Sequence, residues 1–173
     1  PLAFGTAGLR GTMKVGLHHM NVHVVRWVTQ GFAEVICAES DWAGDRKAAV
    51  CMDGRKNSRR FAEAAAEVLA ANGITVYLFD GPRPTPELSF AVRAYGCLAG
   101  INITASHNPK EYNGYKAYWC DGAQLQTETA MAVSARLEEI DVFAGPKRMD
   151  LQRGIELGRI CLLGRSCDEA YLK

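Results

Sequence analysis

The sequence has no long hydrophobic run, no closely paired cysteines and almost no net charge. Its longest apolar segments, such as residues 48–52 and 74–79, are far shorter than the roughly 20 residues that span a bilayer, so we expect no membrane protein. Twenty Lys and Arg side chains against nineteen Asp and Glu leave a formal charge of +1. This balance excludes a broad basic surface for nucleic acid, and any anion site must therefore be local.

The cysteines and the start of the chain bear on its compartment and its boundaries. None of the six cysteines forms a C-x-x-C pair, and most lie within apolar segments. This pattern is typical of buried free thiols in a reducing compartment, so we expect a cytoplasmic protein. The chain also begins without an initiator methionine and without the basic segment that opens a signal peptide. We therefore interpret it as part of a longer polypeptide.

What the sequence does have is the composition of one folded domain and an alternation of strand and helix signals. With 173 residues, 48% of them apolar and 23% charged, the chain fits a single domain, residues 1–173. Short apolar runs predict buried strands at 48–52, 74–79 and 98–103. Periodic apolar residues predict helices at 21–39, 58–72, 85–96 and 127–140. Asn21 and Ser58 are expected to cap the first two of these helices.

This alternation predicts a three-layer α/β domain with a mixed, mostly parallel sheet between helices. Right-handed crossovers bring the carboxyl ends of parallel strands to one edge, where ligands bind in open α/β sheets. Asn113-Gly114 is a tight-turn signal, and residues 115–119 predict a strand that pairs antiparallel at an edge of the sheet. In the tail, a short strand is expected at 160–163.

The segment T-A-S-H-N-P, Thr104 to Pro109, follows the third strand and so falls on that edge. Ser106 is the candidate nucleophile, and Lys116 follows on the next expected strand. His107 is badly placed as a base for Ser106, because neighbours on an extended chain point to opposite sides, and no G-x-S-x-G motif is present. Both observations argue against a Ser-His hydrolase. Taken alone, the segment is also consistent with a polar turn capped by Ser and Asn.

The segment F-G-T-A-G-L-R-G, Phe4 to Gly11, has glycines three residues apart. This spacing matches neither the dinucleotide fingerprint nor the P-loop. It is consistent with a pliable loop through which backbone amides and Arg10 approach an anion, since a guanidinium suits bidentate phosphate contact. Taken alone, the octapeptide favours a glycine-rich surface turn.

Together, the two segments resemble the α-D-phosphohexomutase superfamily of phosphoglucomutases and phosphomannomutases. The serine loop T-A-S-H-N-P is followed by N-G-x-K at 113–116, and D-G-R-x-x-S at 53–58 and T-P-x-L at 85–88 fall in the superfamily's order. The glycine-containing start is similar to the branch with phosphopentomutase-type and glucose-1,6-bisphosphate-related members. The resemblance covers nearly the whole chain, as the first of four domains.

The resemblance implies a phosphosugar mutase that works through a phosphoserine. Ser106 would donate its phosphoryl group to a phosphosugar and regain one from the resulting sugar bisphosphate. Lys116 corresponds to the general acid/base candidate and Arg10 to a phosphate-facing arginine. The implied site residues are Ser106, Lys116, Arg10 and His107 as catalytic groups, and Thr104, Asn108 and Gly114 as substrate-binding groups.

The resemblance also implies Mg²⁺, which would touch the phosphate on Ser106. The superfamily's D-G-D-x-D-R metal loop does not occur in this sequence, so the remaining ligands and the distal phosphate grip would come from missing domains of the same polypeptide. We therefore expect the chain alone to be inactive. A different reading is a stand-alone phosphosugar or anion-binding module in which Ser106 is never phosphorylated.

Overall fold

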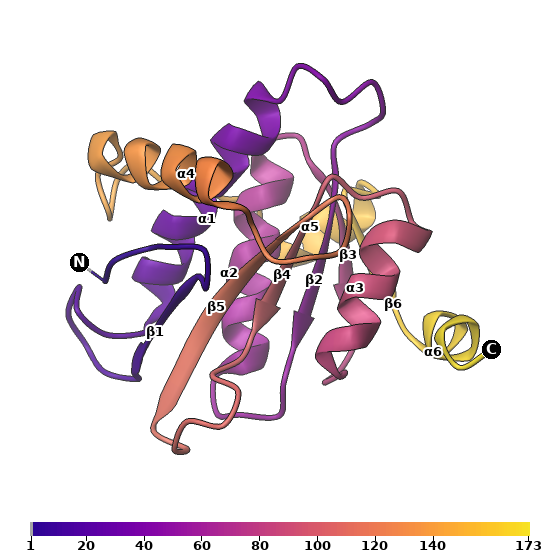
Figure 1. Ribbon diagram of the computed structural model, residues 1–173, viewed down its shortest axis with the longest axis horizontal. Coiled ribbons are helices and arrows are strands. Elements are labelled where there is room, and N and C mark those ends of the chain that lie inside the picture. Colours follow the sequence, from indigo (N-terminus) through magenta and orange to yellow (C-terminus); the bar gives the residue numbers. More distant parts are fainter. Residues whose placement is uncertain (1) are drawn as a thin grey trace.

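The computed structural model describes residues 2–173, in which six strands form one sheet with helices on both faces (Figure 1). The strands are β1 (Leu9–Thr12), β2 (Lys47–Met52), β3 (Thr75–Phe79), β4 (Ala99–Ile103), β5 (Tyr112–Trp119) and β6 (Ile160–Leu163). The helices are α1 (Val22–Ala38), α2 (Ser58–Ala71), α3 (Thr85–Ala94), α4 (Thr127–Glu139), α5 (Leu151–Glu156) and α6 (Arg165–Tyr171). The predicted three-layer α/β architecture is confirmed.

The strand order across the sheet is β1-β5-β4-β2-β3-β6. Strands β4, β2, β3 and β6 are parallel, whereas β5 runs antiparallel to both β4 and β1. The sheet is therefore mixed and mostly parallel, as predicted. Because β1 runs in the same direction as β4, the loops that follow β1, β2, β3 and β4 meet at one edge, together with the start of β5.

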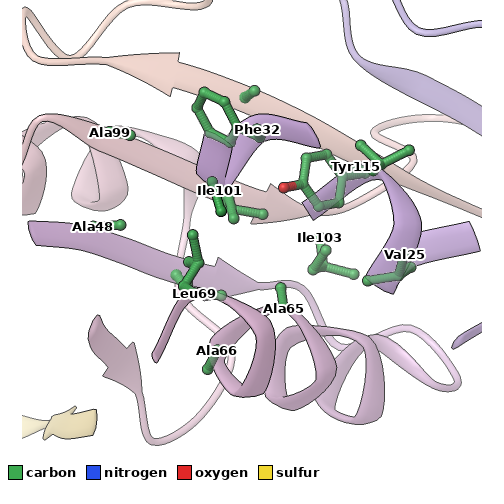
Figure 2. Packing of buried hydrophobic residues seen from close by; sticks show 14 of the residues in the cluster. Val25, Phe32, Ala48, Ala65, Ala66, Leu69, Ala99, Ile101, Ile103 and Tyr115 are labelled. Carbon is green, nitrogen blue, oxygen red and sulfur yellow. The ribbon is translucent and has the colours of Figure 1, made fainter. Parts of the chain in front are cut away.

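The two faces of the sheet have separate apolar cores, because side chains along a strand alternate between faces. On β2, Ala48 and Val50 pack in the larger cluster with residues of α1 and α2, whereas Ala49 and Cys51 pack in a smaller cluster with residues of α3. Figure 2 shows the larger cluster, where Phe32 of α1 lies over the sheet. Helix α4 crosses α1 (Figure 1). Helices α1 and α2 cover the first face, and α3 covers β2 and β4 on the second.

The helix starts follow the predictions in part. The Asn21 side chain accepts hydrogen bonds from the backbone N–H groups of His23 and Val24, so its predicted role as a cap is confirmed. The prediction for Ser58 is wrong. Ser58 is the first residue of α2, the position before it is occupied by Asn57 at φ 65°, and no side chain caps this helix. Ser58 is buried and makes side-chain contacts with other elements, which are described below.

The segment around Asn113-Gly114 also differs from the prediction, because both residues lie inside β5 and form no tight turn. They pair with Gly11 and Arg10 of β1, so β5 is an interior strand and not an edge. A Cβ on Gly114 would lie 2.6 Å from the carbonyl oxygen of Thr104. The glycine at this position therefore permits a close approach between strands, and not a change of chain direction.

The tail contains the predicted strand β6 and two helices, α5 and α6, that were not predicted. The α6 helix is attached through Asp168, whose two carboxylate oxygens accept hydrogen bonds from Arg83 at 2.6 and 2.9 Å. Within residues 2–173, no helix is long and apolar enough to cross a membrane. All six cysteines are free thiols.

Candidate active site

Ser106 lies exposed on the loop between β4 and β5, at the edge of the sheet where the parallel strands end. Its backbone has φ 57°, in the left-handed region that non-glycine residues seldom adopt. The Ser106 backbone N–H donates to the Thr104 hydroxyl at 3.0 Å, and the Asn108 N–H donates to the Ala105 carbonyl at 3.1 Å. A left-handed residue of this kind costs about 1–3 kcal/mol and persists only where its surroundings hold it in place.

The side chain of Arg55, from the loop between β2 and α2, holds the serine loop in this shape. Its Nη2 donates to the carbonyl oxygens of Ser106 and Asn108, each at 2.7 Å. Its Nη1 donates to the carbonyl oxygens of Pro109 at 2.8 Å and Tyr112 at 3.3 Å. One side chain therefore joins four carbonyl groups of the segment from Ser106 to Tyr112, the first residue of β5.

Asp53 supports Arg55 from behind and links it to two further polar residues. One carboxylate oxygen of Asp53 accepts from Arg55 Nε at 3.1 Å, and the other accepts from the Ser58 hydroxyl at 2.7 Å. The Ser58 hydroxyl in turn accepts from the side-chain amide of Asn113 at 2.9 Å. The D-G-R-x-x-S segment and the N-G pair are therefore parts of one hydrogen-bond network beneath the serine loop.

Sequence reasoning noticed the D-G-R-x-x-S segment but assigned none of its residues to the candidate site. A signal was present, because Asp53 and Arg55 follow a buried strand directly at its carboxyl end, as the serine loop does. Two loops at that edge are neighbours when their strands are adjacent, and β2 and β4 are adjacent. The missing step was therefore to treat the two loops as one site.

Arg10 and Lys116 lie on the same face of the sheet next to the serine loop. Arg10 is paired with Gly114 across β1 and β5, and Lys116 is two residues further along β5, so all three positions share a face. The Arg10 guanidinium donates to the side-chain oxygen of Asn108 at 3.0 Å. Across from Lys116 on β4 is Asn102. The structure thus brings Arg10 into contact with the serine loop and places Lys116 on the same face of the sheet.

The environment of Lys116 lowers the pKa of its side chain below the usual lysine value. Partial burial lowers the pKa of the Lys116 ammonium, and the nearby positive charge of Arg10 lowers this pKa further. Both causes disfavour the protonated form. A lysine in this position exchanges a proton closer to neutral pH than an exposed lysine does, which a general acid/base requires.

His107 and Thr104 take positions that differ in their access to solvent. His107 is exposed, and its Nδ1 is 3.5 Å from the Ser106 hydroxyl, which is too long for an effective nucleophile–base hydrogen bond. Thr104 is buried, and its hydroxyl is occupied by the backbone N–H of Ser106. The expectation that Ser106 and His107 point to opposite sides is wrong, because Ser106 is left-handed and not extended, and the two side chains approach each other.

A cleft of about 890 Å³ adjoins the serine loop. It is lined by the loop after β1, the loop between β2 and α2, and part of the loop before β5. Lys14, Lys56 and Lys110 lie in its walls, together with Asn108. Ser106 is outside the lining, and Asn108 is the residue that the serine loop shares with this basic cleft.

The residues described do not by themselves form a magnesium site. Between residues 2 and 173 there is no cluster of three His, Cys, Asp or Glu side chains that could hold a metal ion. Asp53 is the carboxylate linked to the serine loop, and both of its oxygens already accept hydrogen bonds from Arg55 and Ser58. The carboxylates that Mg²⁺ prefers are therefore lacking at Ser106 in this part of the chain.

Comparison with known proteins decides the family. Residues 1–143 match the family described as phosphoglucomutase/phosphomannomutase, alpha/beta/alpha domain I. The chain belongs to this family. The predicted resemblance to the α-D-phosphohexomutase superfamily is thereby confirmed.

The family's relatives agree with this assignment. Phosphoglucomutase from Staphylococcus saprophyticus is 40% identical over 172 residues, which is 99% of this chain and 31% of that protein. Phosphoglucomutase from Staphylococcus aureus is 45% identical over 139 residues, 80% of this chain and 25% of that protein. The chain spans about a third or less of the length of these curated relatives.

Solved structures in the family share the fold. A Thermus thermophilus protein, assigned provisionally as a phosphomannomutase, superposes with a TM-score of 0.73 at 32% identity, covering 88% of this chain and 34% of that one. A phosphoglucomutase/phosphomannomutase family protein from Burkholderia thailandensis gives a TM-score of 0.69 at 23% identity, over 99% of this chain and 34% of its own. The second likeness concerns the fold alone.

Proposed function

We propose that this chain is the serine-bearing domain of a phosphosugar mutase and that Ser106 carries the phosphoryl group. The observation that carries the proposal is the position of Ser106. It is exposed on a fixed loop, and Arg10 and Lys116 lie beside that loop on one face of the sheet. Phosphoryl transfer depends mainly on positioning and on cations that meet the charge of the transferred group. Membership of the phosphoglucomutase/phosphomannomutase family supports this reaction class.

In the proposed reaction, the bond between phosphorus and the Ser106 oxygen breaks as a bond forms to a hydroxyl oxygen of the phosphosugar. Lys116 takes the hydroxyl proton and passes it to the departing Ser106 oxygen, so the products are a sugar bisphosphate and a Ser106 hydroxyl. After the bisphosphate turns over in the site, its other phosphoryl group is transferred to Ser106, and Lys116 carries the Ser106 proton to the sugar oxygen that is released. The negative phosphoserine favours protonated Lys116, whereas burial and Arg10 favour the neutral form, so the two influences keep the proton transferable.

The remaining machinery would come from outside these residues. We assign to further domains the magnesium ligands and the groups that hold the distal phosphate, because the carboxylates are lacking here and the chain matches about a third of its relatives' length. The contact that this chain offers to Mg²⁺ is the phosphate on Ser106. The ion, when bound, neutralises part of the charge that develops on the transferred group.

The proposal is tested in the full-length protein with two serine variants, Ser106→Ala and Ser40→Ala. Ser40 lies in the loop after α1, far along the chain from the site, and serves as the control. Interconversion of glucose 1-phosphate and glucose 6-phosphate is measured with Mg²⁺ and a sugar bisphosphate. Ser106→Ala should lose nearly all turnover while remaining folded, and Ser40→Ala should keep it. Normal turnover in Ser106→Ala would contradict the assignment.

A further inference from the structure

Arg55 uses all of its hydrogen-bonding capacity within the protein. A guanidinium has five N–H donors and no acceptor. In this structure, the single Nε donor binds Asp53, the two Nη1 donors bind the carbonyls of Pro109 and Tyr112, and the two Nη2 donors bind those of Ser106 and Asn108. Its side chain is 17% exposed. No donor is left for a substrate phosphate, so Arg55 does not act as a phosphate-binding arginine.

The four carbonyl groups define what Arg55 does to the loop. Their oxygens converge on one guanidinium, and without it they would repel one another and turn outward to water. Ser106, whose carbonyl is among them, holds its left-handed φ of 57° against a preference for other conformations. The bonds from Arg55 therefore fix the backbone that carries the nucleophilic hydroxyl.

We propose that Arg55 is a positioning residue that orients Ser106 for phosphoryl transfer through the backbone, an inference that rests on the proposed function. The planar fork of a guanidinium reaches two pairs of carbonyls at once, which a lysine ammonium cannot do. Asp53 aligns the fork and offsets its positive charge. Arg10 and Lys116 thus remain the cations that meet the substrate.

The test compares Arg55→Lys with Arg46→Lys in the full-length protein. Arg46 is a matched control, because it also donates to two backbone carbonyls, those of Ile36 at 3.1 Å and Glu39 at 2.9 Å. It directly precedes β2 and so lies at the opposite edge of the sheet from Ser106. Both variants replace a guanidinium with an ammonium group and keep the positive charge. Only Arg55→Lys makes this change at the serine loop.

The decisive readout is the rate at which Ser106 gains a phosphoryl group from glucose 1,6-bisphosphate, followed by quenching and intact mass. A displacement of about 1 Å at a reacting centre slows a reaction by roughly a hundredfold, so Arg55→Lys should slow the transfer by about ten- to a hundredfold. The loss should appear in kcat while KM stays nearly constant, because no substrate contact is removed. Arg46→Lys should transfer at the normal rate even if it loses equal thermal stability.

The outcomes separate this inference from the proposed function. If Ser106 of the unaltered protein neither carries a phosphoryl group at isolation nor gains one, the proposed function fails. If Ser106 of the unaltered protein is phosphorylated and Arg55→Lys transfers the phosphoryl group at the same rate, the positioning role of Arg55 is refuted and the proposed function stands. The same conclusion follows if Arg55→Lys changes only KM. Asp53→Asn provides a second variant, since it removes the charge that aligns the fork and should slow the transfer by a smaller factor. Unchanged transfer in whichever of these two variants folds contradicts the inference.

Discussion

Replacing Gly8 with alanine should displace β1 from its close approach to β5 and destabilise the chain, whereas the same change at Gly5 should have almost no effect. The two glycines bond to each other through their backbones, at 2.8 and 3.1 Å, and enclose a two-residue turn. Gly8 has φ 76°, and a Cβ there would lie 1.8 Å from the carbonyl oxygen of Tyr115. At Gly5, a Cβ meets nothing within 4 Å, and its φ lies outside the left-handed range. Comparing the two substitutions therefore distinguishes the steric requirement for a glycine at position 8 from a general effect of glycine flexibility in this loop.

The magnitude follows from two contributions. An alanine in the left-handed conformation costs about 1–2 kcal/mol. To reach even 3.0 Å from the Tyr115 oxygen, the Cβ must retreat by about 1.2 Å, which is the difference between 3.0 and 1.8 Å. Because the obstacle is a backbone atom, β1 itself must move. Leu9, which is 4% exposed in the structure, then loses part of its burial, and this lowers the free energy of unfolding by about a further 2 kcal/mol. The sum is about 3–4 kcal/mol.

The assay is urea unfolding of this chain, followed by circular dichroism, with Gly5→Ala as the control. Gly8→Ala should lower the free energy of unfolding by about 3–4 kcal/mol and Tm by about 10 °C for a chain of this size. Gly5→Ala should stay within about 0.5 kcal/mol of the unaltered chain. Equal effects at the two positions would refute the reasoning, because they would show that Gly8 is not needed for the approach of β1 to β5.

Two other outcomes follow from the site. Arg10→Met should raise the pKa of Lys116, because it removes a positive charge that disfavours protonation of the lysine. An NMR titration of the Lys116 Nζ in this chain measures the shift. A lowered or constant pKa would contradict the prediction. The chain alone should fold but should not interconvert glucose 1-phosphate and glucose 6-phosphate in the presence of Mg²⁺ and a sugar bisphosphate, because the groups that hold the distal phosphate are lacking. Turnover near that of a complete mutase would show that those groups are not needed.

The central strands and long helices could be predicted because their signals are local. The apolar run at 48–52 becomes β2, covered on both faces, and the periodicity of 21–39 becomes α1. β1 was missed because it has four residues, includes Gly11, and depends on a partner more than a hundred residues away. Asn113-Gly114 was misjudged because a turn propensity yields to pairing on both sides of the strand.

The candidate site could be predicted only where side chains carry the signal. Ser106, Arg10 and Lys116 were predicted from their motifs, and the structure places Arg10 and Lys116 on one face of the sheet, with Arg10 in contact with the serine loop. Arg55 was missed because most of its partners are backbone carbonyls, which leave no pattern in a sequence. Ser58 was misread as a cap because its hydroxyl instead donates to Asp53 and accepts from Asn113, which lies on a strand distant in the sequence.

The most direct measurement is the intact mass of the full-length protein before and after incubation with glucose 1,6-bisphosphate and Mg²⁺, followed by peptide mapping. The account predicts one phosphoryl group, located on Ser106, that is present at isolation or gained during incubation and then lost to added sugar phosphate. Absence of any phosphoryl group under both conditions, or its location on another residue, would contradict the claim that Ser106 carries the transferred group.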